Sequence, residues 1–249
     1  MQVVANRRHL SKAPITEAVI DLRVKFSEPP EMAVLSSLEQ EFSDEFPVRK
    51  KQFQLQAEIK LDAGQFSGRG DRRERGLLLK SADESEVVQF RVDGFTYSRL
   101  RPYTSWEEIF PKAWRLWEAY RSKTSPESIT RLATRYINRL EIQNPSTNLA
   151  DYLETPPIVP EGIPNILKNF FIRFTLYDDE TKANINLIQA SEVSLDPMRA
   201  VILLDIDVYR DDGPFEDDSQ IKKIFSELRE IKNRVFFNSI TEETARIFE

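Results

Sequence analysis

Apolar and polar residues follow two different rhythms in the first part of the chain. Residues 15–26 alternate one by one between apolar and polar side chains, which is typical of a half-buried strand. Residues 32–46 carry apolar side chains three and four positions apart, which predicts an amphipathic helix that ends before Pro47. Residues 53–61 alternate without a break and predict a second strand.

A segment rich in glycine and arginine follows the second strand. Residues 64–75 contain three glycines and four arginines, so we expect a loop there. Two more strand-like runs come next, over residues 76–81 and 86–92. Asp93 and Gly94 fit either a tight hairpin turn with a returning strand or a bulge in one long strand, and the sequence leaves both open.

A long aromatic helix is predicted to begin after Ser105. Ser105 and Glu108 have the spacing of a capping box, in which each side chain binds a free amide of the first turn. Aromatic side chains at helical spacing form one broad face of this helix: Trp106, Phe110, Trp114, Trp117 and Tyr120. Three tryptophans exceed what a small sheet needs to cover it, so we expect most of this face in the core and part of it against another chain.

The second half of the chain presents a similar order of elements. Residues 129–142 predict a long strand, and residues 155–164, with four prolines and one glycine, predict a crossing between two bodies or around an edge. Three alternating strands follow, over residues 169–177, 182–190 and 200–209. Asp217 and Gln220 resemble a second capping box, and the apolar stripe after them predicts a long last helix.

These elements predict an α+β fold. We expect antiparallel sheets, each packed by long helices, in two pseudo-repeated halves that each run strand, helix, strands, helix. The halves would span residues 13–125 and 126–249, and one continuous domain fits the same pattern. No residue identity connects the halves, so the duplication is a hypothesis about topology.

Composition narrows the class of protein. Apolar residues make up 40% of the 249 residues, which is enough for a core, and the net charge of −6 argues against wrapping nucleic acid over the whole surface. The lack of cysteine excludes disulfides and thiolate chemistry, and a single histidine excludes a His pair as metal ligands. We find neither a long apolar run nor a secretory signal, and expect a cytoplasmic protein with no membrane partner.

Three arginines stand out on the strand predicted over residues 129–142. Arg131, Arg135 and Arg139 are four positions apart, so they share one face over steps of about 13 Å. Such a ladder fits phosphate groups or an acidic partner. It also fits cross-strand pairing with acidic residues of the first strand, such as Glu17 and Asp21, and this structural interpretation is the one we favour.

A second group of arginines lies in the predicted loop and near the end of the strands that follow it. Its members are Arg69, Arg72, Arg73, Arg75, Arg99 and Arg101. These residues fit a grip on a phosphate backbone or a loop that docks a partner. Because Asp71 and Glu74 stand among the loop arginines and weaken their field, a solvated loop is the interpretation we favour.

No set of residues has the spacing of a reaction centre. Asp205 and Asp207 share one face of a predicted strand, where two carboxylates either hold Mg²⁺ or, far more often, form the wet side of a sheet. His9 lies in a basic segment without a serine elbow or a glycine-rich phosphate loop beside it. We therefore expect no catalytic residue, no metal ion and no cofactor, and an enzyme is the less favoured class.

Several motifs resemble a known group of proteins. They are APITEAVID at residues 13–21, RLRPYTSWE at 99–107, RYINRL at 135–140 and FNSITE at 237–242. In this order they resemble a family of sporadically distributed, uncharacterised bacterial proteins of about this length. The resemblance implies no activity, ligand or catalytic residue, and the patchy distribution of the family implies a link to mobile or antiphage defence genes.

Three functions remain in view. Our first hypothesis is a non-enzymatic interaction or regulatory protein that binds a protein partner or forms a homo-oligomer, because arginine and aromatic surfaces suit interface hot spots. The alternative is a nucleic-acid or nucleotide-phosphate binder that uses the arginine ladder. The third is a phosphohydrolase with charged strands lining a closed sheet, suggested by Glu17, Asp21 and Lys25, whose spacing does not match the Glu-x-Glu-x-Lys pattern of such enzymes.

Overall fold

The computed structural model describes residues 5–62, 65–143, 148–164, 167–192, 196 and 198–249. The strands run over Ile15–Lys25 (β1), Val48–Asp62 (β2), Gln65–Lys80 (β3), Glu86–Arg91 (β4), Gly94–Leu100 (β5), Ser128–Gln143 (β6), Phe171–Asp178 (β7), Ala183–Glu192 (β8) and Arg199–Arg210 (β9). The α-helices run over Met32–Glu41 (α1), Trp106–Thr124 (α2), Asp218–Ser239 (α3) and Glu242–Ile247 (α4), and Leu149–Asp151 forms a 3₁₀ turn (η1).

All of these strands belong to one antiparallel sheet. Their order is β2-β3-β4-β5-β1-β6-β9-β8-β7, so nine strands form a single layer where the sequence suggested separate sheets. The sheet is continuous because β1 and β6 pair along almost their whole length. Each of these two strands also has a second neighbour, β5 on one side and β9 on the other. The α+β class is confirmed.

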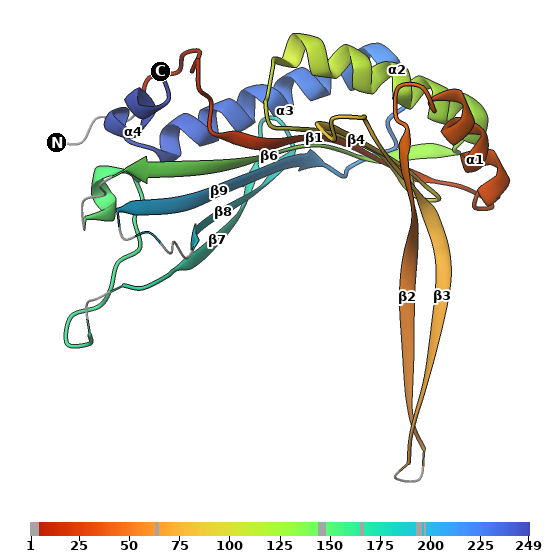
Figure 1. The fold of residues 1–249 in the computed structure, drawn as a ribbon, viewed down its shortest axis with the longest axis horizontal. Coiled ribbons are helices and arrows are strands. Elements are labelled where there is room, and N and C mark those ends of the chain that lie inside the picture. The colour runs from red at the N-terminus through yellow and green to blue at the C-terminus, as the bar shows by residue number, and fades with distance from the viewer. Residues whose placement is uncertain (1–4, 63–64, 144–147, 165–166, 193–195, 197) are drawn as a thin grey trace.

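The α-helices cover one face of the sheet (Figure 1). Both predicted caps are present: the Ser105 hydroxyl accepts a hydrogen bond from the Glu108 amide at 3.2 Å, and the Asp217 carboxylate accepts one from the Gln220 amide at 2.6 Å. These bonds satisfy amides that the first turn of a helix leaves free. Among the described residues, no helix combines the length and apolarity needed to cross a membrane.

The core lies between the sheet and the two long helices. From α2, Trp117 packs against Phe95 and Tyr120 stacks on Phe90, with ring centroids 6.1 and 6.2 Å apart. The helices also touch each other through Phe110 and Phe225, whose ring centroids are 5.5 Å apart. This aromatic layer accounts for the broad apolar face that the sequence assigns to α2.

Two local predictions are decided by strand pairing. The hairpin alternative is confirmed, because β4 and β5 are antiparallel neighbours and Arg91 lies opposite Gly94. The turn residues are Val92 and Asp93, and Gly94 begins the returning strand. The expected loop is wrong over residues 65–75, because Gln65 onward belongs to β3, and residue 64 lies outside the described residues. Charged residues hide the alternation there, and the backbone is held as a strand by its pairing with β2.

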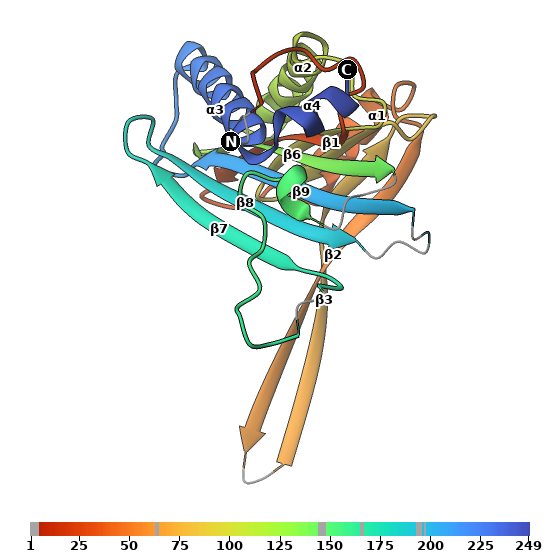
Figure 2. The same ribbon diagram turned by 90° about the vertical axis from the view of Figure 1, so that its left-hand side faces the viewer.

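The β2–β3 hairpin projects from the sheet as an arm (Figures 1 and 2). β3 pairs with β4 only over its last residues, from Gly76 to Lys80, whereas its pairing with β2 continues to Asp62 opposite Gln65. At about 3.3 Å per residue, the free part of the arm extends roughly 35 Å beyond the sheet. A two-stranded ribbon of this length has no core of its own.

Candidate functional site

The arginine ladder lies on the face of the sheet opposite the α-helices. Leu132 and Tyr136 of β6 point into the core, so the alternation of the strand sends Arg131 and Arg135 to the other face. There β6 is flanked by β1 and β9, and both neighbours present carboxylates towards it. The ladder is thus part of a charged network across the centre of the sheet.

Asp21 of β1 is the centre of this network. Its Oδ2 accepts hydrogen bonds from Thr96 Oγ1 at 2.7 Å and from Arg91 Nη2 at 3.1 Å. Its Oδ1 accepts from Arg23 Nε and from Arg131 Nη1, both at 3.1 Å. Burial alone would raise the pKa of Asp21, but the guanidinium groups of Arg91 and Arg23 outweigh burial and hold it below its ordinary value. The carboxylate is therefore ionised and fully partnered.

The other carboxylates come from β9. Arg135 makes a bidentate pair with Asp205, with its Nε 2.8 Å from Oδ1 and its Nη2 2.5 Å from Oδ2. This pair raises the pKa of Arg135. Arg131 donates to Asp207 at 3.2 Å and lies 4.3 Å from the centre of the Tyr209 ring. Burial raises the pKa of Asp207, although Arg131 opposes that shift.

The predicted pairing of the ladder with Asp21 is confirmed at Arg131. The sequence analysis did not identify Asp205 and Asp207 as partners of the arginines. The local pattern of a strand does not show which other strand will lie beside it. The described part of the chain has no cluster of three or more histidine, cysteine, aspartate or glutamate side chains that could hold a metal ion. The cleft beside the network has a volume of about 330 Å³.

The remaining arginines of the predicted site are dispersed. Arg139 pairs with Glu192 at 2.9 Å and with Glu141, which Arg101 also contacts at 3.3 Å. Arg99 lies 3.5 Å from Glu86. Arg75 pairs with Asp93 at the edge of the network, whereas the side chains of Arg69, Arg72 and Arg73 lie outside the described part of the chain. Arg101 and Arg139 share Glu141 and both line the cavity on the helix side, whereas Arg75 and Arg99 lie elsewhere. Each of these four arginines has a carboxylate beside it.

The three tryptophans of α2 are buried. Trp117 is fully enclosed, and Trp106 and Trp114 are each 7% exposed. The aromatic surface that the sheet does not cover is covered within the chain by α3 and its cationic side chains: Lys222 lies over Trp114 and Arg229 over Trp106. The expected contact of this face with another chain stays a prediction. Trp106 also lines a cavity on the helix side.

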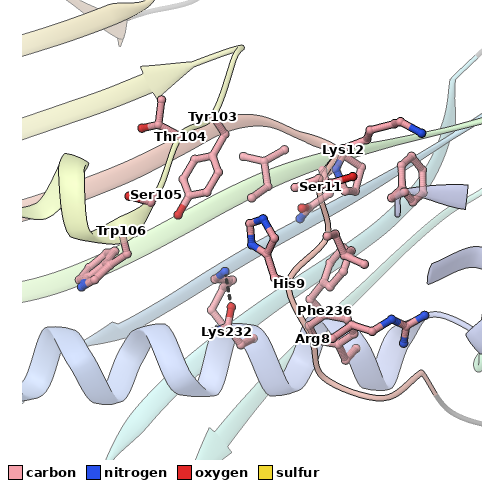
Figure 3. Close-up of a pocket in the computed structure, with 18 of the residues that line it drawn as sticks. Arg8, His9, Ser11, Lys12, Tyr103, Thr104, Ser105, Trp106, Lys232 and Phe236 are labelled. Atoms are coloured by element: carbon pink, nitrogen blue, oxygen red, sulfur yellow. Dashed lines mark hydrogen bonds between the residues drawn. The ribbon is translucent and has the colours of Figure 1, made fainter. Parts of the chain in front are cut away.

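This cavity has a volume of about 1250 Å³. It lies between the N-terminal segment, the β5–α2 connection, α3 and α4, and its floor is formed by β6 (Figure 3). Lys232 of α3 reaches into it and is 8% exposed. The sequence analysis missed Lys232, although a lysine between Leu228 and Phe236 at helical spacing interrupts the apolar stripe and marks a buried charge.

The outer edge of the sheet is the third unusual feature. β7 ends the sheet, and its large side chains are exposed, with Phe171 at 68% and Tyr177 at 58%. Phe174 and Leu176 on its other face are exposed as well. A sheet edge with apolar side chains on both faces is a site for strand addition.

Comparison with known proteins adds no candidate. No family model matches the sequence, and no curated protein matches it.

Proposed function

We propose that the chain is a binding protein that self-associates through the β7 edge of its sheet. The observation that carries this proposal is the exposure of Phe171, Phe174, Leu176 and Tyr177 on an edge strand. Natural edge strands are usually shielded by charge, proline or a covering element. β7 is eight residues long and has a single arginine and a terminal aspartate.

Topology supports a missing neighbour at β7. In one half the order outward from the centre is β1-β5-β4-β3-β2, and in the other half it is β6-β9-β8-β7. If the halves are a topological repeat, which we also propose, β7 corresponds to β3. β2 covers the outer edge of β3, whereas no described strand covers that of β7. A strand from another molecule would complete the pattern.

The sequence of β7 favours a second copy as that molecule. In an antiparallel pair centred on Thr175, Phe174 would lie opposite Leu176 of the second copy, and Arg173 opposite Tyr177. Both are favourable cross-strand pairs, one apolar and one cation–π. Since the centre lies on a residue, a twofold axis perpendicular to the sheet relates the copies and keeps the helices of both on one side.

The aspartates around the arginine ladder weigh against the nucleic-acid alternative. A phosphate at Arg131 or Arg135 would have to displace Asp207 or Asp205. Those carboxylates are held in the sheet and repel phosphate. The ladder therefore supports a stabilising role in the centre of the sheet. We keep the resemblance to the sporadic bacterial family, its defence context and the cytoplasmic location as parts of the proposal.

The test is the mass of the particle in solution. We expect light scattering after size exclusion to give about twice the 29.0 kDa of one chain at micromolar concentration. Leu176→Lys places a charge in the proposed interface and should give the single-chain mass. The matched control is Phe53→Lys, which changes an exposed apolar residue on β2, at the opposite end of the sheet, and should leave the dimer intact.

The absence of cysteine allows a second, geometric test. Thr175→Cys places one thiol at the proposed axis, where opposite Cα atoms of an antiparallel pair are about 4.5–5.5 Å apart and fit a disulfide. Mild oxidation should cross-link this variant to a dimer and leave Phe53→Cys monomeric on a denaturing gel. A wild-type mass of one chain at all concentrations, or equal cross-linking at both positions, overturns the proposal.

A further inference from the structure

The cavity on the helix side combines an apolar wall with a cationic one. Trp106, Phe236 and Phe237 supply aromatic surface. Lysine and arginine outnumber glutamate among its lining residues by seven to two. In Figure 3, the imidazole of His9 lies between the Tyr103 side chain and Lys232. A volume of about 1250 Å³ is enough for a ligand of nucleotide size.

Most of the cations around the cavity are already neutralised. Arg229 pairs with Glu107 at 3.1 Å, and Arg8 pairs with Glu242 at 2.9 Å. Lys232 differs: within the described part of the chain it has no carboxylate within ion-pair distance. Its Nζ donates to the Asn233 side chain at 2.6 Å and lies 3.8 Å from the centre of the Tyr136 ring.

A buried ammonium without a counter-ion is costly, so its retention calls for an explanation. Burial is the main cause that lowers the pKa of Lys232 to about 7, and Arg229 and Arg7 lower it further, while Glu230 opposes them. An arginine or a surface lysine would keep its charge at a higher pH. Near neutral pH, Lys232 is therefore poised to gain a proton when an anion arrives.

We propose that this cavity binds a small organic anion with an aromatic or aliphatic body. The anionic group lies at the ammonium of Lys232, where it supplies the missing counter-ion. The body packs against Trp106 and Phe236, which line the same cavity. Lys12, which also lines the cavity and has no ion pair within the described residues, adds a second positive charge at the more exposed part of the wall.

This site is separate from the proposed self-association surface. The cavity lies on the face covered by α3 and α4, and none of its lining residues belongs to β7. A variant that abolishes dimer formation at Leu176 should therefore leave ligand binding unchanged. Failure of one proposal has no bearing on the other.

The probe for the test is 8-anilinonaphthalene-1-sulfonate, an aromatic sulfonate whose fluorescence rises in an apolar site. We expect saturable binding to the folded wild-type protein at pH 6. Lys232→Met keeps the length and apolar stem of the side chain but removes its charge, and should weaken binding at least tenfold. Lys232→Arg retains a positive charge and should bind within a few-fold of wild type.

Two matched controls locate the signal. Lys222→Met removes a lysine that is on α3 like Lys232 but lies over Trp114 of α2, outside the cavity. This variant should leave the affinity for the probe unchanged. Leu176→Lys removes apolar surface from β7, where the probe could also adhere, and should not affect the saturable phase. Circular dichroism and a melting curve for each variant establish that the fold is retained.

Dependence on pH supplies an independent readout. Because the ammonium form binds the anion, affinity for the probe should fall as pH rises from 6 to 9, and Lys232→Met should lack this dependence. His9 also faces the cavity, so His9→Gln is measured alongside and should retain the dependence above pH 7.5. Absence of saturable binding to wild type, or equal affinity of wild type and Lys232→Met at pH 6, overturns the proposal.

Discussion

Lys232 offers the sharpest test of how burial controls charge in this fold. Its replacement by methionine keeps the side-chain length and its packing but removes the ammonium group from an 8% exposed position. The pKa of Lys232 falls from 10.5 to about 7 on folding, mainly through burial. A shift of about 3.5 units corresponds to roughly 5 kcal/mol between the charged and neutral forms. We therefore expect Lys232→Met to be more stable than wild type by about 3–5 kcal/mol at pH 6.

The sign of the pH dependence follows from proton counting. Between pH 7 and 10.5 the unfolded chain keeps the proton on Lys232 that the folded chain releases. The stability of wild type therefore rises with pH across this window, relative to a variant without the amine. The advantage of Lys232→Met should be complete at pH 6 and small at pH 10.

Urea unfolding at pH 6, 8 and 9.5, followed by circular dichroism, measures this difference. The control is Lys222→Met, an exposed position on the same helix, which should stay within about 0.5 kcal/mol of wild type at each pH. The reasoning is wrong if Lys232→Met is no more stable than wild type at pH 6, or if its gain in the free energy of unfolding is the same at every pH. Either result would mean that burial of the Lys232 ammonium does not destabilise the folded protein.

Two further predictions concern the sheet. Asp21→Asn removes the negative charge that accepts hydrogen bonds from four donors. It should lower the free energy of unfolding, measured by urea titration at pH 7, by about 2–4 kcal/mol. The control is Glu192→Gln, which changes an exposed ion pair and should lower the same free energy by less than about 1 kcal/mol. Because the pKa of Asp21 is lowered on folding, the wild-type advantage should disappear as pH falls below 4. Gly94→Ala would place a Cβ 2.3 Å from the Leu22 carbonyl oxygen at a φ of +156° and should cost more than about 1 kcal/mol by thermal unfolding.

The elements with strong apolar periodicity were predictable from the sequence. The alternation of β1 and β6, the Ser105 and Asp217 caps and the aromatic face of α2 all depend on residues close together in the chain. The pairing of Arg131 with Asp21 was also predictable, because both strands repeat charge on one face. The first part of β3, residues 65–75, was missed, since arginine and glycine conceal its alternation and only its pairing with β2 holds it extended.

The chain by itself therefore determined the type of most elements and the chemistry of the central charges. Only the tertiary structure decided that β1 and β6 join two sets of strands in one sheet and that Asp205 and Asp207 pair with the arginines. It also decided that Lys232 lies in a cavity where no described carboxylate is within ion-pair distance of it. The physical reason is that periodicity reports which side of an element avoids water. Neighbours across a sheet or a cavity come from distant parts of the chain, and local spacing carries no information about them.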